Sequence, residues 1–478
     1  MNLLRKYLTA IGLVVVITIV SYGQYHDPTW SAKSVLIDKQ GLGKDSLKNI
    51  LHNKGIFEGH FRNFFMTTTN HDTYPDYFAL GVGGGLGYYS PIIKGFQVGL
   101  SGFIIYNLAS SSLSPDPPFS NRYEVGLFDI TNPNNHKDLN RLEDLYLRYY
   151  FSKKNKSFLQ AGKFHLKTPM INLQDGRMGP NLQEGVWAEW NDSKKVKVKG
   201  GWIWRTSPRS TIRWFDIGQS LVYPNGRSVN GEKANYSGYT KSEGIAIANL
   251  GWKPTKSIDY QIWNYYVDQL FNMVWNKAEY KWKVGERTVM AGIQYAWQKS
   301  MYGDTLSLEK QYITQGEQSH TFSARIGLVN DRKGAEWSVN YTRITRHGRY
   351  LFPREWGIEP FYTFMQRERN EGAGDVHAAN FQHTHFLDKS KNWEVLVAAG
   401  MYWMPSTNDA RLNKYAMPSY YQLNARSRYR FNGFLRGLNL EVLYVYKGNM
   451  DRSIEVQPVY YHNKVDMHNL SVVIDYYF

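Results

Sequence analysis

The stretch LNARSRYRF, residues 423–431, places an arginine at every second position. Side chains alternate across a β-strand, so Arg426, Arg428 and Arg430 would share one face of a strand. The opposite face would carry the residues Leu423, Ala425, Tyr429 and Phe431. A strand with this pattern separates two environments, one that accepts cations and one that is apolar.

The same alternation recurs along the chain in about eighteen segments of roughly ten residues, a pattern typical of a transmembrane barrel. The segments are 57–69, 78–90, 96–108, 143–151, 157–166, 184–190, 195–205, 245–253, 258–267, 276–284, 288–297, 321–329, 336–344, 377–386, 393–403, 422–431, 438–446 and 468–478. We therefore predict an all-β protein, a transmembrane antiparallel up-and-down β-barrel of about 18 strands.

The connections between these segments alternate between short polar turns and long loops. The long ones include residues 206–244, 300–320, 345–375 and 404–421. Outer-membrane barrels have short periplasmic turns and long external loops. A soluble sandwich or propeller also has short strands, but it does not ordinarily sort its loops by length.

The N-terminal residues predict export. Arg5 and Lys6 precede an apolar run from Leu8 to Val20, followed by small residues. We interpret residues 1–23 as a cleaved signal peptide, residues 24–56 as a periplasmic extension and residues 57–478 as the barrel with inward-folded loops. A retained membrane anchor is the alternative, but the apolar run is shorter than the roughly 18 residues that a spanning helix needs.

The composition limits the partners and the chemistry. The chain has 0 cysteines, so it has neither disulfides nor thiolate metal sites, and its formal charge is +16. A basic protein can bind nucleic acid, but export favours anionic solutes, outer-membrane lipid and lipopolysaccharide instead. We predict no cofactor and no enzymatic activity.

The last strand carries a further signal. In LSVVIDYYF, residues 470–478, the apolar Val472, Ile474, Tyr476 and Phe478 fall on one face. A terminal Phe after alternating apolar residues resembles the signal read by the barrel-assembly machinery, so we expect Phe478 to contact it. An ordinary last strand of a soluble β-protein is the alternative.

Charged side chains identify the face that lines the lumen, because a cation at the bilayer midplane costs about 2–4 kcal/mol. By this criterion Arg62, Arg148 and Arg325 point inward with Arg426, Arg428 and Arg430. A column of arginines offers successive weak stations for a carboxylate. Alternatively, these cations pair with lumen acids such as Glu441 and fill the interior.

The stretch LQAGKFHLKTPMINLQDGRMGPNLQEGVW, residues 159–187, resembles OprD-type outer-membrane porins. The matching residues are Gly162, Lys163, Pro169, Asp175, Arg177, Met178, Pro180 and Gly185. Met178 replaces the usual Leu, and Gln183 stands where the family tends to have an aromatic residue. The resemblance implies an eighteen-stranded barrel whose third long loop, here with Asp175 and Arg177, folds into the lumen. These two residues could also only brace the loop.

These observations predict an outer-membrane porin for passive or facilitated diffusion of small polar solutes, anionic or carboxylate-bearing, through a basic-lined lumen. A surface receptor or adhesin that uses the long loops is the alternative. His377, His383 and His385 are candidate metal ligands, but no carboxylate stands at ligand spacing near them.

Overall fold

The computed structural model describes residues 55–71, 74–152, 157–174, 176–303, 305–330, 334–451 and 453–478. The predicted signal peptide, and all but the last two residues of the predicted extension, lie outside the described residues. None of the helices in these ranges is long and apolar enough to cross a membrane.

The described chain consists almost entirely of antiparallel strands. They are β1 (Ile56–Asn70), β2 (Tyr77–Tyr89), β3 (Phe96–Ser110), β4 (Leu139–Tyr150), β5 (Phe158–Phe164), β6 (Leu182–Trp190), β7 (Val196–Ser207), β8 (Phe215–Asp216), β9 (Ile245–Trp252), β10 (Ile258–Val267), β11 (Phe271–Val284), β12 (Arg287–Ser300), β13 (Gln318–Asn330), β14 (Ala335–Ile344), β15 (Val376–Phe386), β16 (Trp393–Trp403), β17 (Tyr420–Arg430), β18 (Leu438–Asn449) and β19 (Met467–Tyr477). One short α-helix, α4 (Pro458–Tyr461), lies in the loop before β19.

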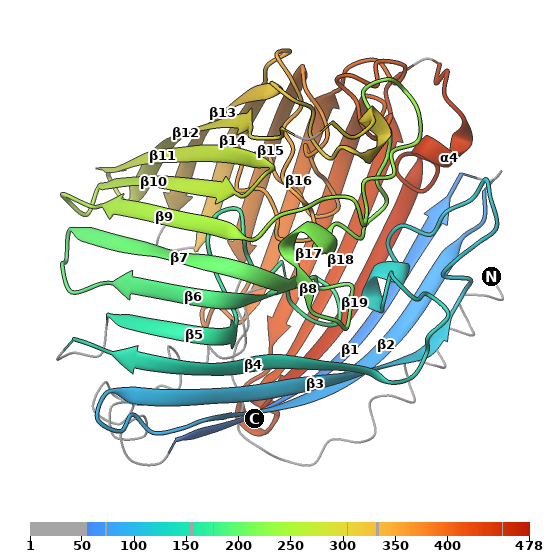
Figure 1. The fold of residues 1–478 in the computed structure, drawn as a ribbon. Coiled ribbons are helices and arrows are strands. Elements are labelled where there is room, and N and C mark those ends of the chain that lie inside the picture. The colour runs from blue at the N-terminus through green and yellow to red at the C-terminus, as the bar shows by residue number, and fades with distance from the viewer. Residues whose placement is uncertain are drawn as a thin grey trace.

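The strands form one closed barrel, in which each pairs with its neighbours along the chain (Figure 1). The two-residue β8 pairs with the end of β7, and β7 pairs directly with β9, so the ring has 18 strands. It closes where β1 pairs with β19, with Arg62 opposite Asp475. Gly59 and Phe478 exchange backbone hydrogen bonds of 2.9 and 3.1 Å at this seam. All the predicted strand segments coincide with ring strands, and the predicted fold class is confirmed.

The connections are sorted between the two rims. One rim, which we call the turn rim, has the connections 90–95, 151–157, 191–195, 253–257, 285–286, 331–334, 387–392 and 431–437. The other, the loop rim, has the connections 71–76, 111–138, 165–181, 208–244, 268–270, 301–317, 345–375, 404–419 and 450–466. This asymmetry is typical of an outer-membrane barrel with its turns in the periplasm.

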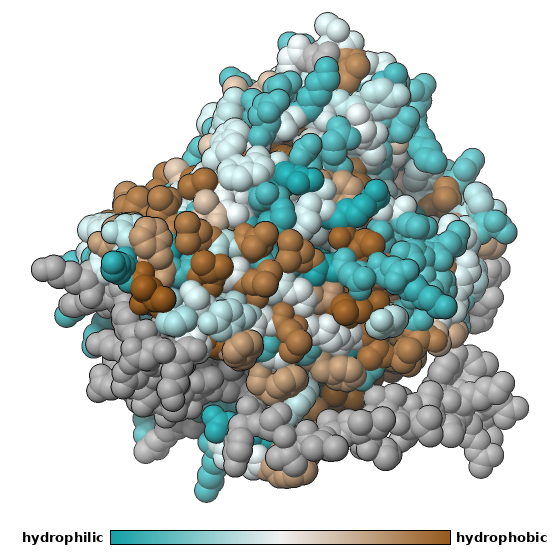
Figure 2. Space-filling model, turned by 60° about the horizontal axis from the view of Figure 1, so that its bottom comes forward, coloured by the Kyte–Doolittle hydropathy of each residue, from teal (hydrophilic) through white to brown (hydrophobic). Residues whose placement is uncertain are grey.

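The wall has an apolar outer face. Outward positions of β4, β13 and β17 carry exposed side chains that include Leu145, Leu147, Phe322, Ile326 and Leu423. Figure 2 shows hydrophobic side chains gathered over one side of the wall. Inward neighbours such as Asp144, Ser323 and Asn424 are buried. Closed pairing also satisfies the backbone groups that lipid could not.

Loops fill much of the interior. The largest cluster of buried apolar side chains combines wall residues such as Tyr265 and Tyr402 with Tyr350, Trp356 and Phe361 of loop 345–375. The lumen is therefore constricted by its own loops, and any solute path runs beside them.

Candidate functional site

Loop 345–375 is held inside the barrel by amide side chains of the wall. Gln294 of β12 donates to the Pro360 carbonyl at 2.9 Å, and Gln422 of β17 donates to the Gln366 carbonyl at 2.8 Å. Irregular backbone away from water must have its carbonyls satisfied, and these inward amides supply the donors. The loop thus brings its own charged side chains to the inner wall.

The arginines of β17 lie in a ladder of charges across three strands. Arg426 Nη2 lies 2.6 Å from Glu394 Oε1 of β16, and Arg428 donates to Glu441 Oε2 of β18 at 2.6 and 2.9 Å. Arg428 also lies 3.7 Å from Glu394. Arg430 shares their face at the turn-rim end of the strand. Charge compensation in the wall is therefore extensive along this column.

The other predicted wall arginines also have partners. Arg62 donates to Asp475 at 2.6 Å, and Arg325 lies 2.7 Å from Glu336. Arg148 donates to Gln160 Oε1 at 2.9 and 2.6 Å and stacks over the rings of Tyr146 and Phe158. The structure brings Arg62, Arg428 and the loop residue Arg177 toward one region, whereas Arg148 and Arg325 contact other partners along the wall.

Arg177 lies on loop 165–181, which folds inward toward β1. Its backbone carbonyl accepts a hydrogen bond of 2.8 Å from Arg62, and its guanidinium donates to the Gly176 carbonyl at 2.7 Å. The other predicted residue of this loop, Asp175, lies outside the described residues. The Arg62 bond fixes the height at which loop 165–181 meets the wall.

Three loops place a cluster of arginines there, which we call the loop arginines: Arg177, Arg209 and Arg367. Arg209 donates to the Gln174 carbonyl at 3.1 Å, and Arg367 donates to Asn469 at 2.9 Å and Ser471 at 2.8 Å on β19. In the part of the chain that the structure describes, none of the three forms an ion pair with a carboxylate. They differ in this respect from Arg62, Arg325, Arg426 and Arg428 of the wall, which each pair with a carboxylate.

The surroundings of the loop arginines disfavour the charged form of each guanidinium group. Burial lowers the pKa of each guanidinium, and the next cause in each case is another member of the cluster. Arg367 lowers the pKa of Arg177, Arg177 lowers that of Arg209, and Arg209 lowers that of Arg367. An anion placed among them would relieve both the burial and the repulsion.

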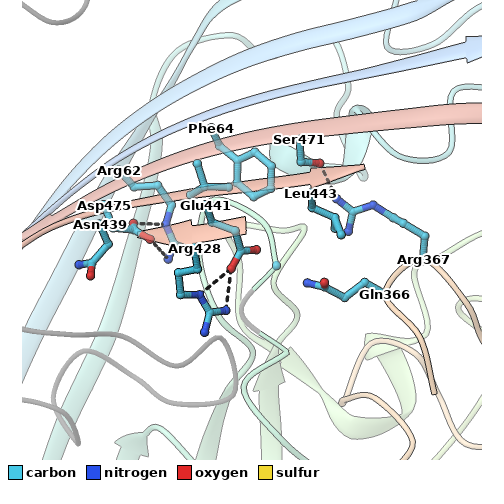
Figure 3. A pocket seen from close by; sticks show the side chains of 12 residues that line it. Arg62, Phe64, Gln366, Arg367, Arg428, Asn439, Glu441, Leu443, Ser471 and Asp475 are labelled. Atoms are coloured by element: carbon cyan, nitrogen blue, oxygen red, sulfur yellow. Dashed lines mark hydrogen bonds and ion pairs between the residues drawn. The ribbon is translucent and has the colours of Figure 1, made fainter. Parts of the chain in front are cut away.

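A narrow cavity opens beside this cluster. Its polar lining includes Arg62, Arg367, Arg428 and Gln366, and its apolar lining consists of Phe64, Leu443 and Val473. Figure 3 shows the guanidinium groups of Arg62 and Arg428 turned to Asp475 and Glu441, while Arg367 reaches Ser471 from the opposite side. The cavity lining therefore combines cations, the carboxylates of Glu441 and Asp475, and a short apolar strip.

A second narrow cavity also has Arg62 in its lining. Its residues include Glu58 and Tyr89 near the turn rim and Met178 and Pro180 of loop 165–181. Arg62 and loop 165–181 thus lie between two spaces, one toward the turn rim and one beside the loop arginines.

The sequence prediction missed Arg209 and Arg367, because irregular loops have no periodicity from which a facing direction follows. One signal was present: Gln294, Gln422 and Asn424 occupy inward positions on wall strands, where amides serve as donors to a loop backbone. Within the described ranges, no group of three or more His, Asp or Glu residues could hold a metal ion.

Comparison with known proteins supports the same class. Residues 140–333 match the family model described as outer membrane porin, OprD family. No curated protein sequence matches the chain.

Solved structures share the fold over nearly the whole barrel. OccAB2 of Acinetobacter baumannii is 14% identical with a TM-score of 0.70, covering 90% of this chain and 98% of its own. OccK9 (OpdG) of Pseudomonas aeruginosa is 11% identical with a TM-score of 0.69, covering 90% and 99%. OpdK of Pseudomonas aeruginosa, solved with vanillate, is 13% identical with a TM-score of 0.63, covering 90% and 99%.

The resemblance predicted from the loop motif is therefore confirmed by the family model and by the fold. Residues 140–333 thus match the OprD family of outer-membrane porins, and the barrel as a whole has the fold of the solved Occ channels.

Proposed function

We propose that this porin passes small polar solutes that carry a carboxylate, by diffusion down their gradient. The observation that carries the proposal is the set of loop arginines, Arg177, Arg209 and Arg367, which have no carboxylate partner among the described residues and lie beside the cavity at the inner wall. Guanidinium groups bind carboxylates with charge-assisted hydrogen bonds, so a solute carboxylate supplies the missing counter-charge.

The shape of the cavity suggests the rest of the solute. Phe64, Leu443 and Val473 add a short apolar part to a lining that otherwise consists mainly of charged and amide side chains. A small hydrocarbon or ring next to a carboxylate would fit both parts. OpdK, which has a similar fold, was solved with vanillate, an aromatic carboxylate, and we extend this chemistry to the present chain.

We assign the wall arginines to two groups. Arg62 and Arg428 line the cavity and would bind the solute carboxylate after it leaves the loop arginines. The solute carboxylate would then compete with Asp475 for Arg62 and with Glu441 for Arg428. Arg148, Arg325, Arg426 and Arg430 would set the potential of the wall and hold its side chains in place. Weak, successive stations allow a solute both to enter and to leave.

The test is the reversal potential of the purified protein in planar bilayers under a salt gradient. We expect anion preference in the wild type and a clear loss of it in R177Q/R209Q/R367Q. The matched control K137Q/K233Q/K241Q removes three exposed loop lysines and should keep the preference. Cation preference in the wild type, or unchanged selectivity in the triple arginine variant, would overturn the proposal. A folded barrel without ion current would instead favour the surface receptor.

A further inference from the structure

The lipid-facing wall carries a basic patch at the loop rim of β12 to β15. We call it the rim patch, and it consists of Lys299, His320, Arg343, Arg346, His347 and His377. Lys299, Arg346, His347 and His377 are exposed, and His320 and Arg343 are half-buried. The rim patch lies on the outside of the barrel, away from the solute path.

The strand register places the members of the rim patch at one height. Arg343 stands opposite His377, and His320 stands opposite Trp297. Each strand residue of the patch lies within two residues of the loop-rim end of its strand. Their alternation with the exposed Phe322, Val339 and Phe381 places them on the outer face of the barrel.

Hydrogen bonds fix the two strand histidines against tyrosines. The Tyr295 hydroxyl lies 2.8 Å from His320 Nδ1, and the Tyr341 hydroxyl lies 2.6 Å from His377 Nδ1. The rings of His320 and His347 are 5.7 Å apart. The polar atoms are thus held at the boundary of the apolar wall instead of extending freely into water.

The charge of the patch is mostly uncompensated within the described chain. Arg343 pairs with Asp375 at 2.5 Å. Lys299 and Arg346 form no ion pair with any described residue. At the same rim, the outward positions of β1, β2 and β3 carry Thr69, Phe78 and Leu108, so these three strands have no cation at this height.

The position of the patch decides the kind of partner. The loop rim of an outer-membrane barrel lies at the outer leaflet, and the exposed wall below it faces lipid chains. Trp297 and the exposed Trp403, at the level where aromatic side chains meet head groups, flank the patch. A ligand at this level has acyl chains below it and an anionic head group beside the cations.

We propose that the rim patch binds the phosphorylated head group of an outer-leaflet glycolipid of the lipopolysaccharide type. Lys299 and Arg346 bind the phosphate as free cations, and Arg343 adds a guanidinium shared with Asp375. The acyl chains lie on the apolar wall between β12 and β15. The patch gives the barrel a fixed lateral lipid neighbour at this sector.

The test uses the full-length protein in detergent micelles, with bis-phosphorylated lipid A as the probe and native mass spectrometry as the readout. We expect a bound lipid on the wild type and at least tenfold weaker binding by K299Q/R346Q, which breaks no ion pair of the described chain. The control K137Q/K233Q/K241Q should bind as the wild type does. Lipid A from which both phosphates have been removed should bind at least tenfold more weakly.

Two results would overturn the proposal. One is equal binding of bis-phosphorylated lipid A by K299Q/R346Q and by the wild type, with both proteins shown to be folded by circular dichroism and heat-dependent gel mobility. The other is equal binding of phosphorylated and dephosphorylated lipid, which would mean that only the apolar wall attracts it. Single-channel conductance should be the same in all these variants, which keeps this test separate from that of the solute path.

Discussion

At the scale of single residues, Arg428 connects three strands by charge. It stands between Glu394 on one side and Glu441 on the other, and it is 5% exposed, so its two partners are held in a largely water-free wall. Removing Arg428 leaves Glu441 without its close cation, whereas Glu394 keeps Arg426, and an unpaired buried acid costs more than removing the whole pair. Arg428 therefore matters for the stability of the wall as well as for the potential of the lumen.

We predict that R428Q destabilises the folded barrel by about 3 kcal/mol, because it leaves Glu441 buried without its cation. Guanidinium unfolding in lipid vesicles, followed by tryptophan fluorescence, measures the loss. The double variant R428Q/E441Q should recover most of it. If R428Q unfolds at the wild-type denaturant concentration, the ladder contributes nothing to stability.

Gly59 is a second residue with a specific steric requirement. It lies on β1 against the ring of Phe478, and a Cβ atom at this position would overlap that ring. The backbones of the same two residues exchange hydrogen bonds at the closing seam. The absence of a side chain at position 59 therefore lets the last aromatic ring cover the seam.

We predict that G59A displaces the ring of Phe478 and slows closure of the barrel. F478A should slow closure less, because residue 478 keeps its backbone hydrogen bonds with Gly59. Refolding into vesicles, followed by the shift between unfolded and folded bands on a gel, gives the rate. The control G303A changes a glycine with open space around its Cβ position and should refold at the wild-type rate. Normal refolding of G59A would contradict the steric argument.

The facing direction of the wall arginines followed from the period of two, because each strand offers only two faces. The positions of the loop residues of the candidate site did not follow from any such period. Arg367 has a backbone φ of 73°, a left-handed conformation that a residue other than glycine adopts only where surrounding contacts impose it. Those contacts come from Asn469, Ser471 and Lys447, far away in the sequence, so no local pattern predicted them.

At the scale of elements, loop 345–375 contrasts with the strands around it. The strands were predictable because alternation repeats along each of them. The loop's depth depends on wall amides that approach it from several strands, such as Gln294 and Asn380. The two-residue β8 was also missed, since two residues cannot show a period.

The loop contains a buried carboxyl group that should make its packing depend on pH. Glu359 accepts hydrogen bonds from the backbone and side chain of Asn370 at 3.0 and 2.6 Å. Burial raises the pKa of Glu359 to about 7 from an ordinary value of 4.5. The packed loop therefore holds a proton that the released loop gives up, so its packing weakens as the pH rises from about 4.5 through 7.

We predict that backbone hydrogen exchange in residues 345–375 is less protected at pH 8 than at pH 5.5, after correction for the intrinsic rate. The variant E359Q keeps an uncharged oxygen acceptor for Asn370 and should lose much of this pH dependence. Equal protection at both pH values in the wild type would contradict the predicted proton on Glu359.

At the scale of the whole molecule, the barrel and its filling are separable parts. The wall is held by continuous pairing around the ring, and β14 pairs with β15 along their full lengths, from Ala335 opposite His385 to Ile344 opposite Val376. Loop 345–375 connects these two strands but adds no strand to the ring. The wall should therefore form without most of the loop.

We predict that replacing residues 349–372 by a short Gly-Ser connection leaves a folded barrel with a several-fold larger single-channel conductance, because the loop occupies the lumen. Planar-bilayer recording measures the conductance, and circular dichroism reports the strand content. A replacement of the same length in loop 208–244 provides a comparison. An unchanged conductance after removal of residues 349–372 would mean that ions bypass this loop.

The seam between β1 and β19 also constrains how the cell must make this protein. Arg62 and Asp475, which meet across the seam, are separated by 413 positions in the chain. The first strand therefore has no partner on one side until β19 has been synthesised. A barrel of this kind cannot be finished during translation, so the chain must travel with its apolar strand faces uncovered. We therefore expect its passage to the membrane to require a partner that shields those faces until both edges can meet.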